Sequence, residues 1–280
     1  MTRKTIVITG AGDGIGAAAA TLLAARRHHV VIVGCSPVKM EALAWELGAS
    51  FYIADFTKLR EVHTLAEWLL ATYPRIDVLA NNAGGVSGSK RRVTQDGHEL
   101  TFQVNYLAGF LLTRLLLNRL IDSRATVINT ASIGNRALGH LDIDDLENVK
   151  KYSPFKAFGD SKLAQVLFTR ELYRRYGQFG LTAAAFHPGN TTSKYLWLES
   201  IEMGADTLAW LAGGQPGADF PPGEYFYRRK IAKPNRQAFD ANLASKLWDR
   251  SETMLRGSEG LRLAGQPGRS PESSYVHQTL

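Results

Sequence analysis

Runs of β-branched residues alternate with stretches of helix-forming residues along the first two thirds of the chain. The run "KTIVITG" (4–10) precedes "IGAAAATLLAARR" (15–27), and "VVIV" (30–33) precedes "MEALAWEL" (40–47). Further strand-type runs follow at 50–56, 76–84, 125–132 and 181–189, separated by helical stretches at 60–73, 98–120 and 155–177. Because such alternation forms a parallel sheet covered by helices, it predicts an α/β fold with a doubly wound parallel sheet.

The pattern becomes less regular after residue 190. We expect a loop at 213–224, a short strand at 225–227 and a last helix at 239–256. The segment 190–235 is interpreted as a small irregular insertion on the substrate side of a single domain that covers residues 1–264. Residues 265–280 are polar and rich in turn formers, so a mobile tail is predicted there.

Composition narrows the class of protein. With 45% hydrophobic and 21% charged residues, the chain is typical of a soluble globular protein, and no apolar run reaches the roughly 18 residues of a membrane-spanning helix. The first apolar run is too short for a signal peptide, which predicts a cytoplasmic protein without a membrane partner. The single cysteine, Cys35, has no companions at metal-ligand spacing, so no metal is expected.

The net charge of +7 comes from short basic clusters at 90–92, 174–176 and 228–230. These clusters are scattered and do not form one stripe with interleaved aromatic residues. They favour a solvated surface over a nucleic-acid interface. Only the basic pI of about 9.5 supports a nucleic-acid interface. Part of the positive charge would be used to bind a phosphate-rich small molecule.

The segment "TGAGDGIG" (9–16) joins the first predicted strand to the first predicted helix. Glycines at 10, 14 and 16 allow a sharp turn and bring backbone N–H groups against a pyrophosphate at the helix N-terminus. The spacing differs from the Gly-x-Gly-x-x-Gly fingerprint, and a tight turn without a ligand would also explain it.

Further motifs follow in a recognisable order: "NNAG" at 81–84, Asn105, Ser132, Lys162 and "HPG" at 187–189. In this order, residues 4 to about 193 resemble the short-chain dehydrogenase/reductases, which have a Rossmann-type fold. The segments 161–172 and 243–252 are similar to the retinol-dehydrogenase-like branch. Within it, the chain resembles the atypical ketoreductases of aromatic polyketide (angucyclinone) biosynthesis.

The resemblance implies a role for each matching position. Ser132 would hydrogen-bond the substrate carbonyl, Lys162 would bind the nicotinamide ribose, and Asn105 would kink its helix and anchor a water of the proton relay. The other residues implied to bind the cofactor are Gly10, Gly12, Asp13, Gly14, Ile15, Gly16, Asp55, Phe56, Asn82, Ala83, Gly84, Pro188, Gly189, Thr191 and Ser193. Each polar residue also fits a bland role as a helix cap or core hydrogen-bond partner.

The end of the second predicted strand bears on the choice of cofactor. NAD sites place a carboxylate there to hold the ribose 2′-hydroxyl. The sequence has no acid from Val30 to Met40 and offers Ser36 and Lys39 instead. NADP(H) is therefore favoured over NAD(H), although the usual arginine is absent at Ser36.

The family's catalytic tyrosine is missing, because Phe158 stands four positions before Lys162. A benzene ring cannot donate a proton, and general acid–base catalysis is typically worth about 10²–10⁴-fold. Three other donors are open: a water held near Asn105 and Lys162, the His187 side chain, or the substrate itself. We favour a phenolic hydroxyl of the substrate beside the ketone, because an intramolecular group has a high effective concentration. His187 and Tyr152 are better explained as structural residues.

Aromatic residues gather between 195 and 227, where they would stack on a flat ligand or form a small core of their own. The residues predicted to contact the substrate are Ser132, Tyr152, Phe158, Tyr195, Trp197 and Trp210. The sequence thus favours an NADPH-dependent ketoreductase of a bulky aromatic ketone. The alternative is a catalytically inactive NADP(H)-binding regulatory protein, and the oligomeric state stays open.

Overall fold

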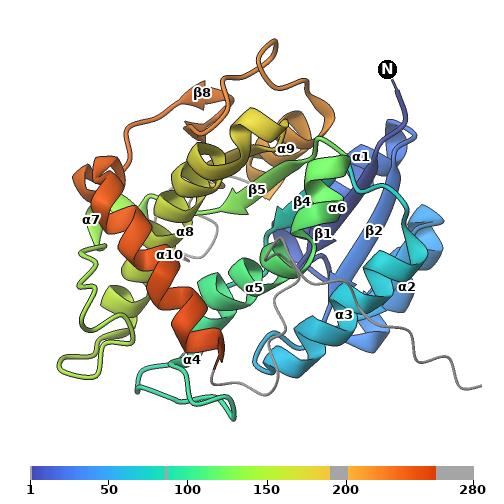
Figure 1. The fold of residues 1–280 in the computed structure, drawn as a ribbon. Coiled ribbons are helices and arrows are strands. Elements are labelled where there is room, and N and C mark those ends of the chain that lie inside the picture. Colours follow the sequence, from blue (N-terminus) through green and yellow to red (C-terminus); the bar gives the residue numbers. More distant parts are fainter. Residues whose placement is uncertain (1, 86–87, 190–200, 257–280) are drawn as a thin grey trace, which may run out of the picture.

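The computed structural model describes residues 2–85, 88–189 and 201–256, and in these ranges the strands form one sheet in the order β3-β2-β1-β4-β5-β6-β7-β8 (Figure 1). Neighbouring strands are parallel except for the antiparallel pair β7 and β8. This confirms the predicted doubly wound fold. The strands are β1 (Thr5–Thr9), β2 (His29–Gly34), β3 (Ser50–Ile53), β4 (Val78–Asn81), β5 (Thr126–Thr130), β6 (Thr182–His187), β7 (Tyr225–Tyr227) and β8 (Lys230–Ile231).

Helices cover both faces of the sheet. On one face α1 (Gly14–Ala25), α2 (Pro37–Leu47) and α9 (Ile201–Gly213) pack on a core that includes Ile6 and Ile8 of β1. On the other face α3 (Leu59–Thr72), α5 (Ala108–Leu115) and α8 (Pro154–Tyr176) pack on a core that includes Val7. Because successive side chains of a strand point to opposite faces, an unbroken apolar strand such as β1 serves both cores.

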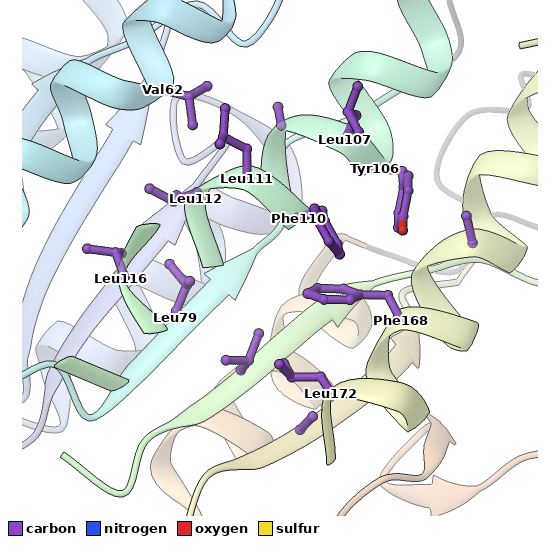
Figure 2. Close-up of a cluster of buried hydrophobic side chains, with 14 of the residues drawn as sticks. Val62, Leu79, Tyr106, Leu107, Phe110, Leu111, Leu112, Leu116, Phe168 and Leu172 are labelled. Atoms are coloured by element: carbon purple, nitrogen blue, oxygen red, sulfur yellow. The ribbon is translucent and has the colours of Figure 1, made fainter. Parts of the chain in front are cut away.

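Figure 2 shows part of the second core, where rings from α5 and α8 meet. The Phe110 ring centroid lies 5.2 Å from that of Phe168, and Trp248 approaches Phe110 at 5.0 Å. Trp248 belongs to α10 (Ala241–Arg256), the red helix that crosses α8 and α5 in Figure 1. The last described helix therefore completes this core.

The predicted helix at 98–120 is not continuous. It consists of α4 (Leu100–Phe102), a π-helical segment η1 (Gln103–Leu107), α5 and α6 (Leu117–Asp122). A π-helical turn holds one extra residue and is common at functional sites. Asn105 lies within it, in agreement with the expected kink. The remaining short helices are α7 (Gly134–Ala137), η2 (Gly177–Phe179) and η3 (Arg236–Phe239).

The expectation of an irregular segment from 190 to 235 is wrong for residues 201–213, which form α9. This helix packs along α1, and a Cβ added at Gly204 would lie 2.5 Å from the Pro188 carbonyl oxygen. The helix is anchored at its far end by Lys4, whose Nζ donates to the carbonyl oxygens of Ala212, Gly213 and Gly214 at 3.0, 3.1 and 2.6 Å. Residues 190–200 and the predicted tail at 265–280 lie outside the described ranges.

Within the described ranges, no helix combines the length and the apolar character that crossing a bilayer requires. Among the same residues, no three His, Cys, Asp or Glu side chains come together in a way that could hold a metal ion.

Candidate active site

A cleft of about 530 Å³ opens at the carboxyl ends of the central strands. The loops after β1, β4, β5 and β6 line it, together with one side of α8. From β1 the chain first builds one half of the sheet and then, from β4, the other half. Parallel α/β sheets bind ligands at such a switch point. Of the predicted site residues, the cleft brings together Gly10, Asp13, Gly14, Ile15, Gly16, Asn82, Gly84, Ser132, Phe158, Lys162, Pro188 and Gly189.

The turn between β1 and α1 depends on glycine at two close approaches. A Cβ at Gly10, where φ is +65°, would lie 2.6 Å from Ala83 Cα, and one at Gly16 would lie 2.4 Å from the Gly10 carbonyl oxygen. Gly14 has φ +55° and nothing within 4 Å of the place of a Cβ, so a ligand can approach its Cα, while its N–H is already bonded to Asp13 Oδ1. The start of α1 thus fits a dinucleotide pyrophosphate.

Thr9 ties this turn to the loop after β4. Its Oγ1 accepts hydrogen bonds from the N–H groups of Asn82 and Ala83 at 3.0 and 3.1 Å and donates to the Ala80 carbonyl at 3.1 Å. Asn82 Nδ2 donates to the Thr9 carbonyl at 3.0 Å, and Asn82 Oδ1 accepts from Thr130 at 3.0 Å. The loops after β1, β4 and β5 are therefore locked together beneath the cleft.

A charged pair stands at the other end of the turn. Asp13 caps α1 by accepting from Gly14 N–H at 2.7 Å, and its second oxygen lies 2.5 Å from Lys39 Nζ. The Lys39 ammonium and the Gly14 N–H lower the pKa of Asp13. Ser36 is the N-cap residue of α2 and makes no side-chain capping bond. Ser36 and Lys39 follow the end of β2 but do not line the cleft.

Asn105 connects the π-helical segment to α8. Its side chain exchanges two hydrogen bonds with the backbone of Gly85, at 2.8 and 3.0 Å, and donates to Ser161 Oγ at 3.0 Å. Ser161 in turn donates to the Phe158 carbonyl at 2.8 Å. Asn105 therefore positions both the loop after β4 and the turn of α8 that carries Phe158.

Lys162 is 5% exposed and reaches the cleft from α8. Its Nζ donates to the Thr130 carbonyl at 2.8 Å and to Gln165 Oε1 at 3.1 Å, and it lies 5.6 Å from the centroid of the Phe158 ring. Burial lowers the pKa of Lys162 to about 7. Among the described residues no carboxylate lies beside Lys162 to offset burial, so its protonated and neutral forms are both populated near neutral pH.

Ser132 and Phe158 face each other across the start of α7. Ser132 Oγ accepts from Gly134 N–H at 3.1 Å, which leaves its hydroxyl hydrogen to be donated into the cleft. A Cβ added at Gly134 would lie 3.0 Å from Phe158 Cε1, so the ring rests against this glycine. The site thus pairs one hydroxyl donor with an aromatic ring that has no hydroxyl.

His187 lies at the end of β6 and is buried. Its Nδ1 accepts from the N–H groups of Ile133 and Gly189 at 3.2 and 3.3 Å, and its ring stacks on Tyr227 with 5.0 Å between the centroids. These contacts hold the loops after β5 and β6 together, which agrees with the structural role expected for this histidine.

Several predicted site residues lie away from the cleft. Trp210 packs edge-on against Phe220 and Phe226 in the core under α9, and so belongs to the small core that was the alternative explanation for these aromatic residues. Tyr152 is packed near Glu99, which together with burial raises the pKa of its hydroxyl. Neither side chain lines the cleft, so neither is in place to contact the substrate there.

The two residues predicted to contact adenine also make structural contacts. Asp55 accepts from Thr57 N–H at 2.9 Å, and the Phe56 ring is buried in the core under α3. Gly12 and Ala83 flank the turn without lining the cleft. The predictions for Thr191, Ser193, Tyr195 and Trp197 fall outside the described residues.

The sequence reasoning missed the apolar wall of the cleft. Ile133, Leu138 and Phe155 line it beside Phe158 and are 40%, 43% and 67% exposed. Large apolar side chains that are this exposed and gathered in one hollow mark a binding surface. In the sequence they look like core residues, and only their position after β5 and at the start of α8 reveals the wall.

Comparison with known proteins decides the family. The short chain dehydrogenase family pattern matches residues 4–199. The chain is a short-chain dehydrogenase. This family member is 38% identical to a protein named as a daunorubicin C-13 ketoreductase, DnrU, from Streptomyces sp. (strain C5), over 89% of this chain and 91% of that protein. It is 34% identical to human retinol dehydrogenase 13, over 94% of this chain and 88% of that protein.

Solved structures agree with this assignment. An uncharacterized protein from Mycobacterium paratuberculosis matches with a TM-score of 0.76 and 30% identity, covering 93% of this chain and 96% of that one. A metagenomic short-chain oxidoreductase solved with NADP has the same fold, with a TM-score of 0.62, 23% identity and coverage of 76% and 91%. As a short-chain dehydrogenase with ketoreductase and retinol dehydrogenase relatives, the protein is an NAD(P)(H)-dependent oxidoreductase.

Proposed function

We propose that this short-chain dehydrogenase is an NADPH-dependent ketoreductase that reduces a carbonyl of a polycyclic aromatic, polyketide-type substrate. The observation that carries the proposal is the apolar wall of Ile133, Leu138, Phe155 and Phe158 directly beside Ser132. A flat, largely apolar ketone would cover these exposed side chains while its carbonyl oxygen meets the hydroxyl. The similarity to DnrU, which is named as a daunorubicin C-13 ketoreductase, supports the same class of substrate. Within that class, the sequence resemblance favours an angucyclinone, with simocyclinone biosynthesis as the candidate route.

The proposal assigns NADP(H) rather than NAD(H) as the cofactor. The residues that would hold it are the glycine turn at Gly14, the Asn82 loop, Lys162 and the turn at Pro188 and Gly189. No acid stands between Val30 and Met40, and a carboxylate at the end of β2 would repel a 2′-phosphate. Lys39 is the cation nearest to that position along the chain, and its pairing with Asp13 keeps it at the start of α1.

The chain's own groups prepare the carbonyl for reduction. Bound NADPH supplies the hydride. Ser132 donates its hydroxyl hydrogen to the carbonyl oxygen, because its acceptor side is already used by Gly134 N–H. Phe158 packs on the substrate and offers no proton. We propose that a phenolic hydroxyl next to the ketone donates the proton, since it is already in contact with the carbonyl oxygen.

Matched substrates test the proposal. Purified protein is mixed with NADPH and with two aromatic ketones that differ only in a hydroxyl beside the carbonyl, and NADPH oxidation is followed. We expect the hydroxylated ketone to react faster by about 10²-fold or more, the range of general acid catalysis. Equal rates would rule out the substrate-derived proton, and no reaction with any aromatic ketone would rule out the ketoreductase.

A catalytically inactive NADP(H)-binding regulatory protein is the second candidate. One observation favours it: Phe158 occupies the place of the family's proton donor. Such a protein would bind NADPH, seen as a change in nicotinamide fluorescence, without oxidising it in the presence of either ketone. Turnover of either ketone excludes it.

A further inference from the structure

The side chain of Gln165 lies directly behind the active-site lysine. Gln165 is 2% exposed and follows Lys162 by three residues on α8, so both side chains lie on one face of the helix. Its Oε1 accepts from Lys162 Nζ at 3.1 Å, and its Nε2 donates to the main-chain carbonyl of Asn105 at 2.6 Å. One amide therefore joins the lysine to the π-helical segment by two direct hydrogen bonds.

These two bonds use both ends of the Gln165 amide. The π-helical segment displaces the regular hydrogen bonding of its helix, and the freed carbonyl groups of such segments are commonly satisfied by side chains or water. Here the Asn105 carbonyl has a side-chain donor. Because Nζ, the amide and the carbonyl are joined by direct hydrogen bonds, no water molecule is needed to bridge Lys162 and the Asn105 carbonyl.

The region beyond Gln165 consists of buried polar side chains that are bonded to one another, except that Asn81 Oδ1 has no hydrogen-bond partner among the described residues. Thr169 Oγ1 donates to the Gln165 carbonyl at 2.8 Å and accepts from Asn129 at 2.9 Å. Asn81 Nδ2 donates to Asn129 at 3.1 Å and to Thr113 at 3.0 Å. All these side chains are buried. The interior side of Lys162 is thus closed by protein groups for several residues.

The donor hydrogens of Lys162 leave one open direction. One points to the Thr130 carbonyl and one to Gln165, and the third is left for the cleft, which Lys162 lines. Its neighbours on the cleft side include the Phe158 ring and, around Gly84, the side chain of Asn105, whose Oδ1 accepts from the Gly85 N–H.

We propose that Gln165 is a positioning residue that seals the interior side of Lys162, so that protons reach this lysine and the reacting carbonyl only through the cleft. The inference rests on the proposed function and deepens it. With no water path from the interior, the proton for the product must be carried by the substrate or enter together with it. The sealed lysine and the phenylalanine at 158 then have the same consequence: the protein itself supplies no proton to the product.

Two substitutions separate sealing from hydrogen bonding. Gln165→Ala removes the amide and leaves space for water, whereas Gln165→Leu removes the hydrogen bonds but keeps the space filled. In ¹⁵N-lysine-labelled protein, exchange of the Lys162 ammonium hydrogens with solvent is measured by NMR below pH 7, with and without NADP⁺. We expect NADP⁺ to slow exchange at least tenfold in wild type and in Gln165→Leu, and to have little effect in Gln165→Ala. Equal protection in all three proteins would overturn the proposal.

Turnover gives the second readout. With the ketone that lacks its own hydroxyl, Gln165→Ala is expected to raise kcat by about tenfold, at the low end of what a proton donor contributes, because water enters behind Lys162. Gln165→Leu is expected to show no gain, and with the hydroxylated ketone neither variant should gain. With the ketone that lacks its own hydroxyl, a higher kcat in both variants would contradict sealing. An unchanged kcat in both variants that still bind NADP⁺ would contradict it as well. If wild type reduces no ketone, the proposed function fails, and the NMR exchange still decides the role of Gln165.

Discussion

At the scale of single residues, the buried Lys162 ammonium has no counter-charge among the residues that the structure describes. Burial lowers the pKa of Lys162 from 10.5 to about 7. Between these two values the unfolded chain binds a proton that the folded chain does not, so the free energy of unfolding rises with pH. We therefore expect Lys162→Met to be more stable than wild type at pH 6 to 7, with the difference shrinking as pH approaches 10. Urea unfolding at several pH values measures it.

Lys39→Met is the control for this prediction. Its side chain is 55% exposed, so water already solvates the charge that the substitution removes. The effect of Lys39→Met on stability should be small at every pH. A Lys162→Met difference that grows toward alkaline pH would show that the lysine is not destabilised by burial.

Phe158→Tyr restores the hydroxyl that the family's proton donor carries. We expect little or no gain in kcat with either aromatic ketone, because the ring rests against Gly134 in a site shaped without a hydroxyl at this position. NADPH oxidation by the variant and by wild type is compared on the matched ketones. A gain of about 10²-fold on the ketone without its own hydroxyl would show that the old proton route still operates.

At the scale of elements, the turn between β1 and α1 is held by the hydroxyl of Thr9. Thr9→Val keeps the shape of the side chain but removes the acceptor of the Ala83 N–H, whereas the Asn82 N–H keeps its bond to the Ala80 carbonyl at 2.9 Å. An unsatisfied buried donor costs about 1–3 kcal/mol, so we expect a loss of roughly 2 kcal/mol in the free energy of unfolding and weaker NADPH binding. Urea unfolding and fluorescence titration provide the two numbers.

Thr21→Val is the matched control. Thr21 lies exposed on α1, and its hydroxyl donates only to the Ala17 carbonyl one turn earlier. The same chemical change there should leave both stability and NADPH binding nearly unaltered. Similar losses in the two variants would mean that valine itself, and not the lost acceptor, causes the effect.

The sequence predicts those elements whose residues share one environment. Strands β1, β2, β4, β5 and β6 are largely buried on both faces, so their apolar runs could be recognised, and the edge strand β3 was recognised although it is partly exposed. The helix α9 was missed because its formation depends on contact with α1 and Pro188, which residue order does not reveal. Strand β8 was also missed, since Lys230 and Ile231 are exposed and are defined only by their pairing with β7.

Only part of the candidate site could be predicted from the sequence. Ser132, Asn105 and Lys162 follow strands or lie in motifs of fixed order, so the resemblance located them. Trp210 was predicted on its aromatic character alone, and its ring packs in the core instead. Gln165 was not considered, because a single glutamine on a buried helix gives no signal until the π-helical segment places the Asn105 carbonyl beside it.

At the scale of the whole molecule, α10 joins the two halves of one core. Trp248 is 2% exposed, contacts Phe110 and Phe168, and lies with its ring 5.2 and 4.7 Å from the guanidinium carbons of Arg114 and Arg175. Replacing a buried large side chain by alanine costs about 3–5 kcal/mol. We expect Trp248→Ala to lower the free energy of unfolding by that amount in urea titrations followed by circular dichroism.

Trp45→Ala provides the comparison within the same chain. Trp45 is 91% exposed on α2, so its removal opens no cavity and should change stability by less than about 0.5 kcal/mol. If Trp248→Ala lowered the free energy of unfolding as little as Trp45→Ala does, α10 would not complete the core.

The bond between Lys4 and the end of α9 has a consequence for how the protein is made. The ammonium of Lys4 leaves the ribosome 208 to 210 residues before the carbonyl groups that receive it. Strand β1 is synthesised first, but it lies in the middle of the sheet and is tied down at its start by one of the later helices. The backbone of Lys4 can bond to His28 and His29 early in synthesis, whereas its side chain can bond to the end of α9 only after residue 214 has emerged.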